Sequence, residues 1–119
     1  MIVTHVIEGN AATRLFVRWT LQRAGFTVTE AATDQHVLAA SPDLLIVDPA
    51  IASLATLRRH HPAAKILVIV DARDPAELDC LVRPFTPSQL LAAVRRCLSR
   101  PDATTGRRRR LRSRRPRRV

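Results

Sequence analysis

The sequence predicts an α/β domain built on a doubly wound parallel sheet. Two short apolar runs, residues 44–47 and 66–70, are rich in branched side chains, as is typical of strands buried on both faces. Strand-like and helix-like segments alternate along the chain, and short turns join them. Because parallel strands need a crossover between them, five strands arranged in this way favour a doubly wound sheet.

The first quarter of the chain predicts a strand, a helix and a second strand. Residues 2–7 are the first strand, and Asn10 is placed to cap the helix that follows. Apolar residues recur at helical spacing in that helix, with Trp19 expected in the core, and Gly25 provides its C-terminal stop. Residues 26–30 alternate between polar and apolar and predict the second strand.

The middle of the chain predicts the central strand with a helix on either side of it. A short helix is expected over residues 33–40, followed by a strand over residues 43–47. Pro49 has no N–H to donate, so the strand is expected to stop before it. A helix of roughly residues 51–61 follows and is expected to end before a proline.

Two strands and two helix starts are predicted in the last part. Residues 65–70 are the fourth strand, and a capping-box pattern at residues 74–77 opens a helix of barely one turn. Residues 80–82 are a short fifth strand. A second capping box at residues 86–89 opens a final helix that reaches about Ser99 and has one apolar stripe.

The predicted strands deliver charged side chains to one edge of the sheet. Glu8, Asp48, Asp71 and Arg83 each follow a strand, and open α/β sheets bind their ligands at the carboxyl ends of the strands. Asp48, after the central strand, is the main candidate functional residue, although an acid there can also be a simple strand-end cap. Asp71 is expected to pair with Arg83 rather than to bind a metal.

The basic charge of the chain is concentrated at its C-terminal end. Residues 1–100 contain eleven Lys or Arg and nine Asp or Glu, a net +2, whereas residues 101–119 contain nine Arg and one Asp, a net +8. We therefore expect one domain over residues 1–100 and an Arg-rich tail over residues 101–119 that is disordered by itself. An Arg-rich tail can bind the phosphate backbone of a nucleic acid without reading its sequence. The candidate contacts are Arg107, Arg108, Arg109, Arg110, Arg112, Arg114 and Arg115. A solvated extension without function is the alternative.

Composition also predicts the environment of the protein. Cys80 and Cys97 lie in apolar contexts without a secretory signal, so they are expected to be reduced core thiols. No apolar stretch approaches the roughly 18 residues of a membrane span, and a cytoplasmic protein without membrane contact is expected.

The adjacent His60 and His61 point apart on a helix, so interaction with the helix dipole is favoured over metal binding.

Three segments resemble the receiver domain of two-component response regulators. Val-Ile-Glu-Gly-Asn at residues 6–10 stands where receivers have an acidic pair, and Pro-Asp-Leu-Leu-Ile-Val-Asp at residues 42–48 matches the strand with the phospho-accepting aspartate. Leu-Val-Arg-Pro-Phe-Thr-Pro at residues 81–87 matches the Lys-Pro-Phe segment before the last helix. The resemblance covers residues 2–100 and implies a flavodoxin-like fold with five parallel strands.

The resemblance also implies roles for the candidate residues. It makes Asp48 the phospho-acceptor, Glu8 and Asp48 the ligands of a weak Mg²⁺ site, and Arg83 a phosphate contact. Hard oxygen ligands suit Mg²⁺, which usually takes only one or two carboxylates and keeps several waters. The implied partner is a histidine kinase or phosphotransfer protein, and the implied module is not an enzyme.

The sequence departs from the receiver pattern at five places. Gly9 replaces the second acid, Asp71 replaces a hydroxyl residue, Arg83 replaces lysine, and Cys80 replaces the switch aromatic. The interval from Asp71 to Arg83 is short, which implies that the fourth helix of the family is largely missing. We therefore expect an atypical, shortened receiver module that is phosphorylated weakly or not at all.

Two other functions remain open on the sequence. One is a nucleic-acid-associated protein that binds through the tail, with the receiver-like body as a homodimerisation module. The other is a Mg²⁺-dependent enzyme, because Glu8-Gly9 with a later Asp48 is similar to the motifs of Toprim domains. In the second case Ala50 stands where a further metal-binding aspartate is needed.

Overall fold

A computed structural model describes residues 2–32, 41–72 and 79–101 of the chain. The predicted helices at residues 33–40 and 74–77 lie outside the described residues, as does the tail beyond residue 101. The domain boundary predicted at residue 100 therefore stays a prediction.

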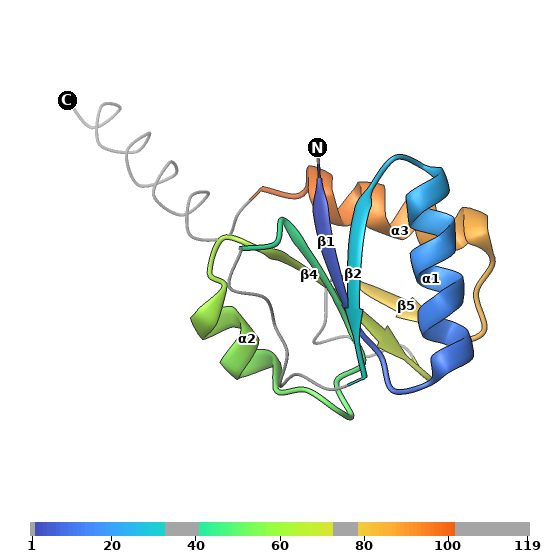
Figure 1. Cartoon of the computed structure of the whole chain (residues 1–119). Coiled ribbons are helices and arrows are strands. Elements are labelled where there is room, and N and C mark those ends of the chain that lie inside the picture. The colour runs from blue at the N-terminus through green and yellow to red at the C-terminus, as the bar shows by residue number, and fades with distance from the viewer. Residues whose placement is uncertain (1, 33–40, 73–78, 102–119) are drawn as a thin grey trace, which may run out of the picture.

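The described residues form a five-stranded parallel sheet (Figure 1). Its strands are β1 (Val3–Ile7), β2 (Thr27–Ala31), β3 (Leu44–Val47), β4 (Lys65–Val70) and β5 (Cys80–Val82). Their order across the sheet is β2-β1-β3-β4-β5, and every neighbouring pair is parallel. The predicted doubly wound α/β class is confirmed, with all five strands within one residue of their predicted positions.

Helices cover both faces of this sheet. Helices α1 (Ala11–Arg23) and α3 (Pro87–Ser99) lie on one face, and α2 (Leu54–His60) lies on the other (Figure 1). Because successive side chains of a strand point to opposite faces, β1 and β3 feed both layers. Val6 and Ile46 pack under α1 and α3, whereas Ile7 and Leu45 pack under α2.

Helix α2 begins three residues later than predicted. The chain turns directly after β3, where the Ile51 N–H donates to the Asp48 carbonyl oxygen at 3.1 Å and the Ala50 N–H donates to Asp48 Oδ1 at 2.9 Å. Ser53 then caps the helix through the Thr56 N–H. These turn hydrogen bonds take the place of a first helical turn.

Helix α1 has the predicted ends but not the predicted core face. Asn10 caps it by accepting the Thr13 N–H at 3.0 Å, and Gly25 ends it with φ at +98°, a conformation that glycine tolerates best. The core position expected for Trp19 is wrong: 56% of this residue is exposed. The buried residues of α1 are Val17, Thr20 and Leu21.

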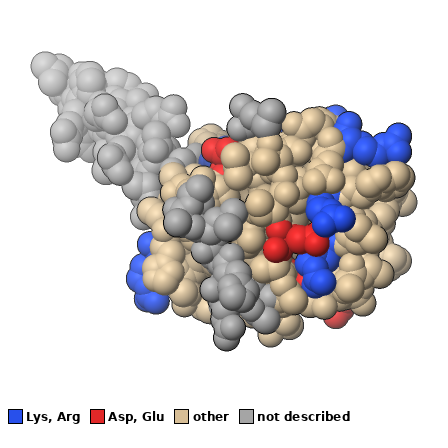
Figure 2. Space-filling view, viewed as in Figure 1, with Lys and Arg blue, Asp and Glu red and all other residues tan. Residues whose placement is uncertain are grey.

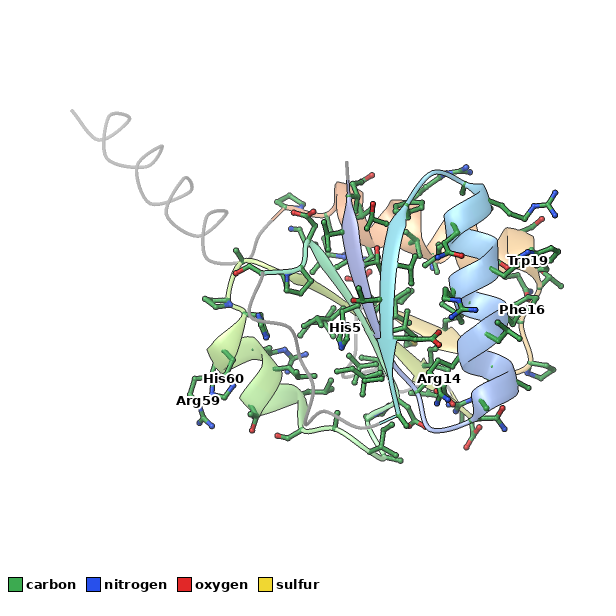
Figure 3. The ribbon with its side chains drawn as sticks, viewed as in Figure 1. His5, Arg14, Phe16, Trp19, Arg59 and His60 are labelled. Atoms are coloured by element: carbon green, nitrogen blue, oxygen red, sulfur yellow. The ribbon has the colours of Figure 1, made fainter. Side chains whose placement is uncertain are left out.

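The position of Trp19 follows from the rotation of α1 on the sheet. Val17 and Leu21 are one turn apart and cover the strands, which turns Trp19 outward (Figure 3). The indole is covered instead by Arg23, whose guanidinium lies 4.8 Å from the ring centroid.

Helix α3 begins at the predicted capping box. Thr86 Oγ1 accepts the Gln89 N–H at 3.1 Å, and Gln89 Oε1 accepts the Thr86 N–H at 2.9 Å. The buried residues of α3 are Leu90, Ala93, Val94 and Cys97, and the predicted apolar stripe is present. No described helix has the length and apolar character needed to cross a membrane.

A carboxylate and arginine cluster at the sheet edge

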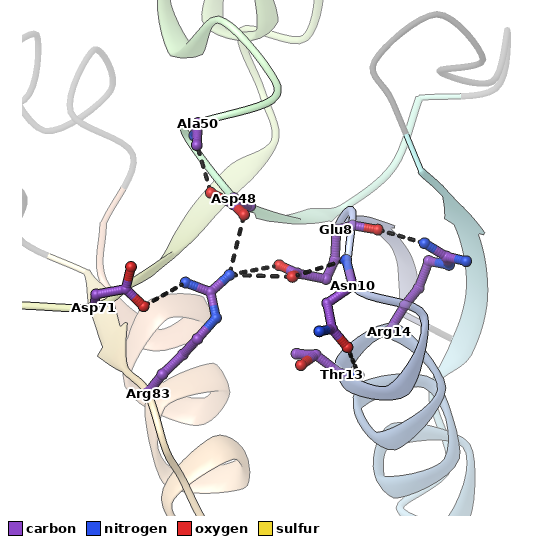
Figure 4. A network of polar contacts seen from close by, with 8 residues as sticks. All are labelled: Glu8, Asn10, Thr13, Arg14, Asp48, Ala50, Asp71 and Arg83. Carbon is purple, nitrogen blue, oxygen red and sulfur yellow. Dashed lines mark hydrogen bonds and ion pairs between the residues drawn. The ribbon is translucent and has the colours of Figure 1, made fainter.

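Four charged side chains meet at the carboxyl ends of the strands. Glu8 follows β1, Asp48 follows β3, Asp71 follows β4 and Arg83 follows β5. Because these strands are parallel and lie side by side in the sheet, their ends converge (Figure 4). The prediction that all four residues lie on one rim is confirmed.

Arg83 lies at the centre of the cluster. Its Nη2 donates to Glu8 Oε2 at 2.8 Å, to Glu8 Oε1 at 3.1 Å and to Asp48 Oδ2 at 3.1 Å. Its Nη1 donates to Asp71 Oδ1 at 3.2 Å (Figure 4). The expected ion pair between Asp71 and Arg83 is therefore present, and a single guanidinium links three strand ends.

The three acids differ in their access to solvent. The side chains of Glu8 and Asp48 are 2% and 17% exposed, and that of Arg83 is 25% exposed. Asp71 is 89% exposed, so water screens its ion pair and its contribution to stability is small. The structural centre of the cluster is therefore the set Glu8, Asp48 and Arg83.

Backbone groups and one further arginine hold the two inner acids. The Asn10 N–H donates to Glu8 Oε1 at 3.3 Å, and Asp48 Oδ1 accepts the Ala50 N–H described above. Arg14 Nη1 donates to the carbonyl oxygen of Glu8 at 2.6 Å. Arg14 was not identified from the sequence. The feature that could have indicated it is its position in the first turn of the helix that follows Glu8.

The neighbouring acids keep Arg83 charged. Burial by itself would lower the pKa of Arg83, but the negative charge of Glu8, its hydrogen bond and the charge of Asp48 outweigh burial and raise this pKa. The guanidinium therefore remains a fixed positive charge between the carboxylates.

The side chains present do not fit the Mg²⁺ ion that the receiver resemblance implies. Mg²⁺ requires oxygen ligands at about 2.0–2.1 Å in a near-octahedral arrangement, whereas the oxygens of Glu8 and Asp48 surround Arg83 Nη2 at 2.8–3.1 Å. Gly9 contributes no side chain, and a Cβ at this position would contact the Ile51 side chain. Within residues 2–32, 41–72 and 79–101, no group of three or more His, Cys, Asp or Glu could hold a metal ion.

The remaining candidate residues lie in structural positions. Cys80 and Cys97 are free and buried, and burial, followed by the charge of Asp79, raises the pKa of Cys97 to about 12. His60 and His61 are the last residue and the C-cap of α2, as expected. The Arg83–Pro84 peptide bond is cis.

An open pocket adjoins the cluster on its α1 side. It has a volume of about 320 Å³ and is lined by Ala12, Thr13, Phe16, Arg83, Pro84 and Phe85. The rings of Phe16 and Phe85 are 5.8 Å apart at its apolar end, and both lie against the core below α1 and α3.

Solved structures share this fold, although no family model and no curated protein matches the sequence. A response regulator from Thermotoga maritima is 22% identical, with a TM-score of 0.72 over 84% of this chain and 99% of that one. The chemotaxis response regulator CheY4 of Vibrio cholerae is 24% identical, with a TM-score of 0.72 over 82% and 98%.

A third similar structure carries ligands. It is a response regulator protein from Burkholderia pseudomallei described with a phosphorylated aspartic acid and a calcium ion. It is 23% identical, with a TM-score of 0.66 over 78% of this chain and 66% of that one. At these identities the likeness concerns the fold, and the expected flavodoxin-like receiver-domain fold is confirmed.

Proposed function

We propose that this chain is a receiver-like signalling module in which Asp48 is a weak phospho-acceptor for a histidine kinase or phosphotransfer protein. The observation that supports this most directly is the placement of Asp48. It follows the central strand of a receiver fold, is 17% exposed, and has Arg83 at 3.1 Å from Oδ2.

The chemistry requires one carboxylate oxygen and one nearby cation. Asp48 Oδ2 attacks the phosphorus of a phosphohistidine and the phosphorus–nitrogen bond breaks. The bonding electrons stay on the nitrogen, and the partner leaves as a neutral imidazole because its other ring nitrogen is already protonated. The product is an acyl phosphate on Asp48. The guanidinium of Arg83 can donate to the phosphoryl oxygens, since arginine binds phosphate through paired N–H donors.

The same contacts explain why the acceptor is weak. Before attack, Oδ2 must give up its hydrogen bond to Arg83 Nη2, and Arg83 must leave the buried Glu8 in part. Asp71 adds a negative charge beside the guanidinium, although its exposure reduces the repulsion. The rate and extent of phosphorylation should therefore be low compared with an acceptor whose carboxylate is unpaired.

The test is phosphorylation of the whole chain by acetyl phosphate or phosphoramidate, followed by intact-mass spectrometry. We expect a minor, hydroxylamine-sensitive phosphorylated species in the wild type that disappears in Asp48→Asn. Asp43→Asn is the matched control, because Asp43 flanks the other end of β3 and accepts the Val3 N–H. If the wild type shows no acyl phosphate, or if Asp48→Asn retains it, Asp48 is not the acceptor.

A further inference from the structure

One nitrogen atom stands at the centre of the acidic cluster. Arg83 Nη2 is within 3.1 Å of three carboxylate oxygens that come from two strand ends. We propose that Arg83 is the resident cation of this site and that its guanidinium excludes divalent metal ions from Glu8 and Asp48. This inference deepens the proposed function, because it makes any phosphorylation of Asp48 independent of divalent metal.

Every oxygen of the two inner acids already accepts a hydrogen bond. Both Glu8 oxygens accept from Nη2, and Oε1 also accepts the Asn10 N–H. Asp48 divides its oxygens between the Ala50 N–H and Nη2. Arg83 Nη2 thus contacts three of the four carboxylate oxygens, and a metal ion that bridged Glu8 and Asp48 would have to displace the guanidinium.

The guanidinium does not leave easily. Glu8 is 2% exposed, and removing Arg83, its cationic partner among the described residues, would leave a poorly compensated charge in the interior. The pKa of Arg83 is raised, so it cannot move aside by losing its proton. A divalent ion that approached Nη2 would also meet a like charge in a partly buried site.

The neighbouring positions offer a metal ion few further ligands. Gly9 follows Glu8 at the end of β1 and carries no side chain. Asp71 is directed to Nη1 at the rim, and most of its side chain is in solvent. Two carboxylates that are already paired are a poor basis for a divalent site.

The length and shape of arginine matter in this arrangement. From the end of β5, Arg83 reaches Glu8, which is 75 residues earlier in the sequence, and holds Asp71 with its second terminal nitrogen. A lysine is a single point charge and cannot occupy both positions at once. The exclusion of metal is thus a property of arginine at this position.

The experiment is a titration of the whole chain with Mn²⁺, with paramagnetic line broadening of the amides around Glu8 and Asp48 as the readout. We expect no selective broadening in the wild type at millimolar Mn²⁺. In Arg83→Ala we expect site-selective broadening, with an affinity for Mn²⁺ about tenfold or more above that of the wild type. Arg18→Ala is the control, because it removes a surface arginine that pairs with Glu30 and should behave as the wild type does.

A double variant shows that the new ion binds in the cluster. Adding Glu8→Gln to Arg83→Ala should abolish the gained affinity for Mn²⁺. The inference is overturned if the wild type binds Mn²⁺ as tightly as Arg83→Ala does, or if Arg83→Ala gains no affinity. If Arg83→Ala does not fold, Arg83→Lys takes its place, because lysine keeps the positive charge but cannot contact the inner acids and Asp71 at the same time.

This titration is independent of phosphorylation. It uses no phosphoryl donor. If the Mn²⁺ titration contradicts the exclusion of metal, the role of Asp48 is still decided by mass spectrometry. If Asp48 accepts no phosphate, the result of the Mn²⁺ titration still stands. Where Asp48 is phosphorylated, adding EDTA to the acetyl phosphate reaction should not reduce the yield.

Discussion

Arg83 and Glu8 show how one side chain can determine the chemistry of a whole site. A carboxylate that is 2% exposed needs a cationic partner, and the nearest one is a side chain from the other end of the sequence. Because the guanidinium also holds Asp48, the proposed phospho-acceptor is already paired in this structure. Reactivity and stability at this edge therefore depend on the same residue.

His5 is a buried ionisable residue within β1. Its Nδ1 lies 2.6 Å from Thr29 Oγ1 on β2, and its Nε2 is buried with no hydrogen-bond partner among the described residues. Burial, followed by the charge of His61, lowers the pKa of His5 from its ordinary value of 6.5. The imidazole of His5 lies within the sheet (Figure 3), and its burial favours the neutral form in the folded protein.

This lowered pKa predicts a loss of stability in acid. The unfolded chain binds a proton at His5 below about pH 6.5 while the folded chain does not, so the free energy of unfolding falls as the pH falls through that value. Above it, this contribution is fully present. Urea denaturation on both sides of that pH should show that the free energy of unfolding depends less steeply on pH in His5→Asn than in the wild type. His60→Asn, which changes an exposed helix-end histidine, should keep the wild-type slope.

At the scale of elements, the rotation of α1 separates its apolar residues into two sets. Leu21 is fully buried under the helix, whereas Leu15 and Trp19 are 53% and 56% exposed. Apolar spacing alone is compatible with more than one rotation, because α1 carries apolar residues on more than one side. Contact with the strands and with α3 selects the side that contains Val17 and Leu21.

The two sides of α1 should respond differently to truncation. We expect Leu21→Ala to lower the free energy of unfolding by about 2–5 kcal/mol, since it leaves a cavity under the helix. Trp19→Ser should cost about 1 kcal/mol or less, because more than half of the residue is already exposed and its contact with Arg23 is a surface contact. Chemical denaturation of both variants measures the difference. Equal losses would contradict the assignment of Trp19 to the exposed side of α1.

At the scale of the molecule, the described part of the body offers a partner few unpaired acidic side chains. Acidic side chains in the described part are largely paired with arginine: Glu8, Asp48 and Asp71 with Arg83, Glu30 with Arg18, and Asp79 with Arg100. In the face that Figure 2 shows, the central acidic patch likewise lies against basic side chains. Most of the net charge of +10 belongs to residues 101–119.

The tail therefore predicts a second, separable property. Nine arginines can release several counterions from a polyanion, which gives weak binding that is blind to sequence and sensitive to salt. Full-length protein should be retained on duplex DNA at low salt, and deletion of residues 106–119 should abolish retention. Electrophoretic mobility shifts over a salt series measure this, with two unrelated duplexes as the control for specificity. Retention by the truncated chain would assign the binding to the body.

Much of the scaffold was predictable because its signals are local. The apolar runs of β3 and β4, the caps at Asn10 and Thr86 and the stop at Gly25 each depend on a few neighbouring residues. With the strands parallel, the meeting of Glu8, Asp48 and Arg83 at one edge followed from the order of the elements.

The sequence by itself thus determined the sheet, its order of helices and strands, and the edge at which the charged residues gather. Only the tertiary structure decided that Arg83 fills the space between the acids, that Arg14 holds the Glu8 carbonyl and that Trp19 faces outward. The physical reason is distance along the chain. Periodicity and caps act over a few residues, whereas the conformation of a long side chain and the rotation of a helix are fixed by contacts between segments that are far apart in sequence.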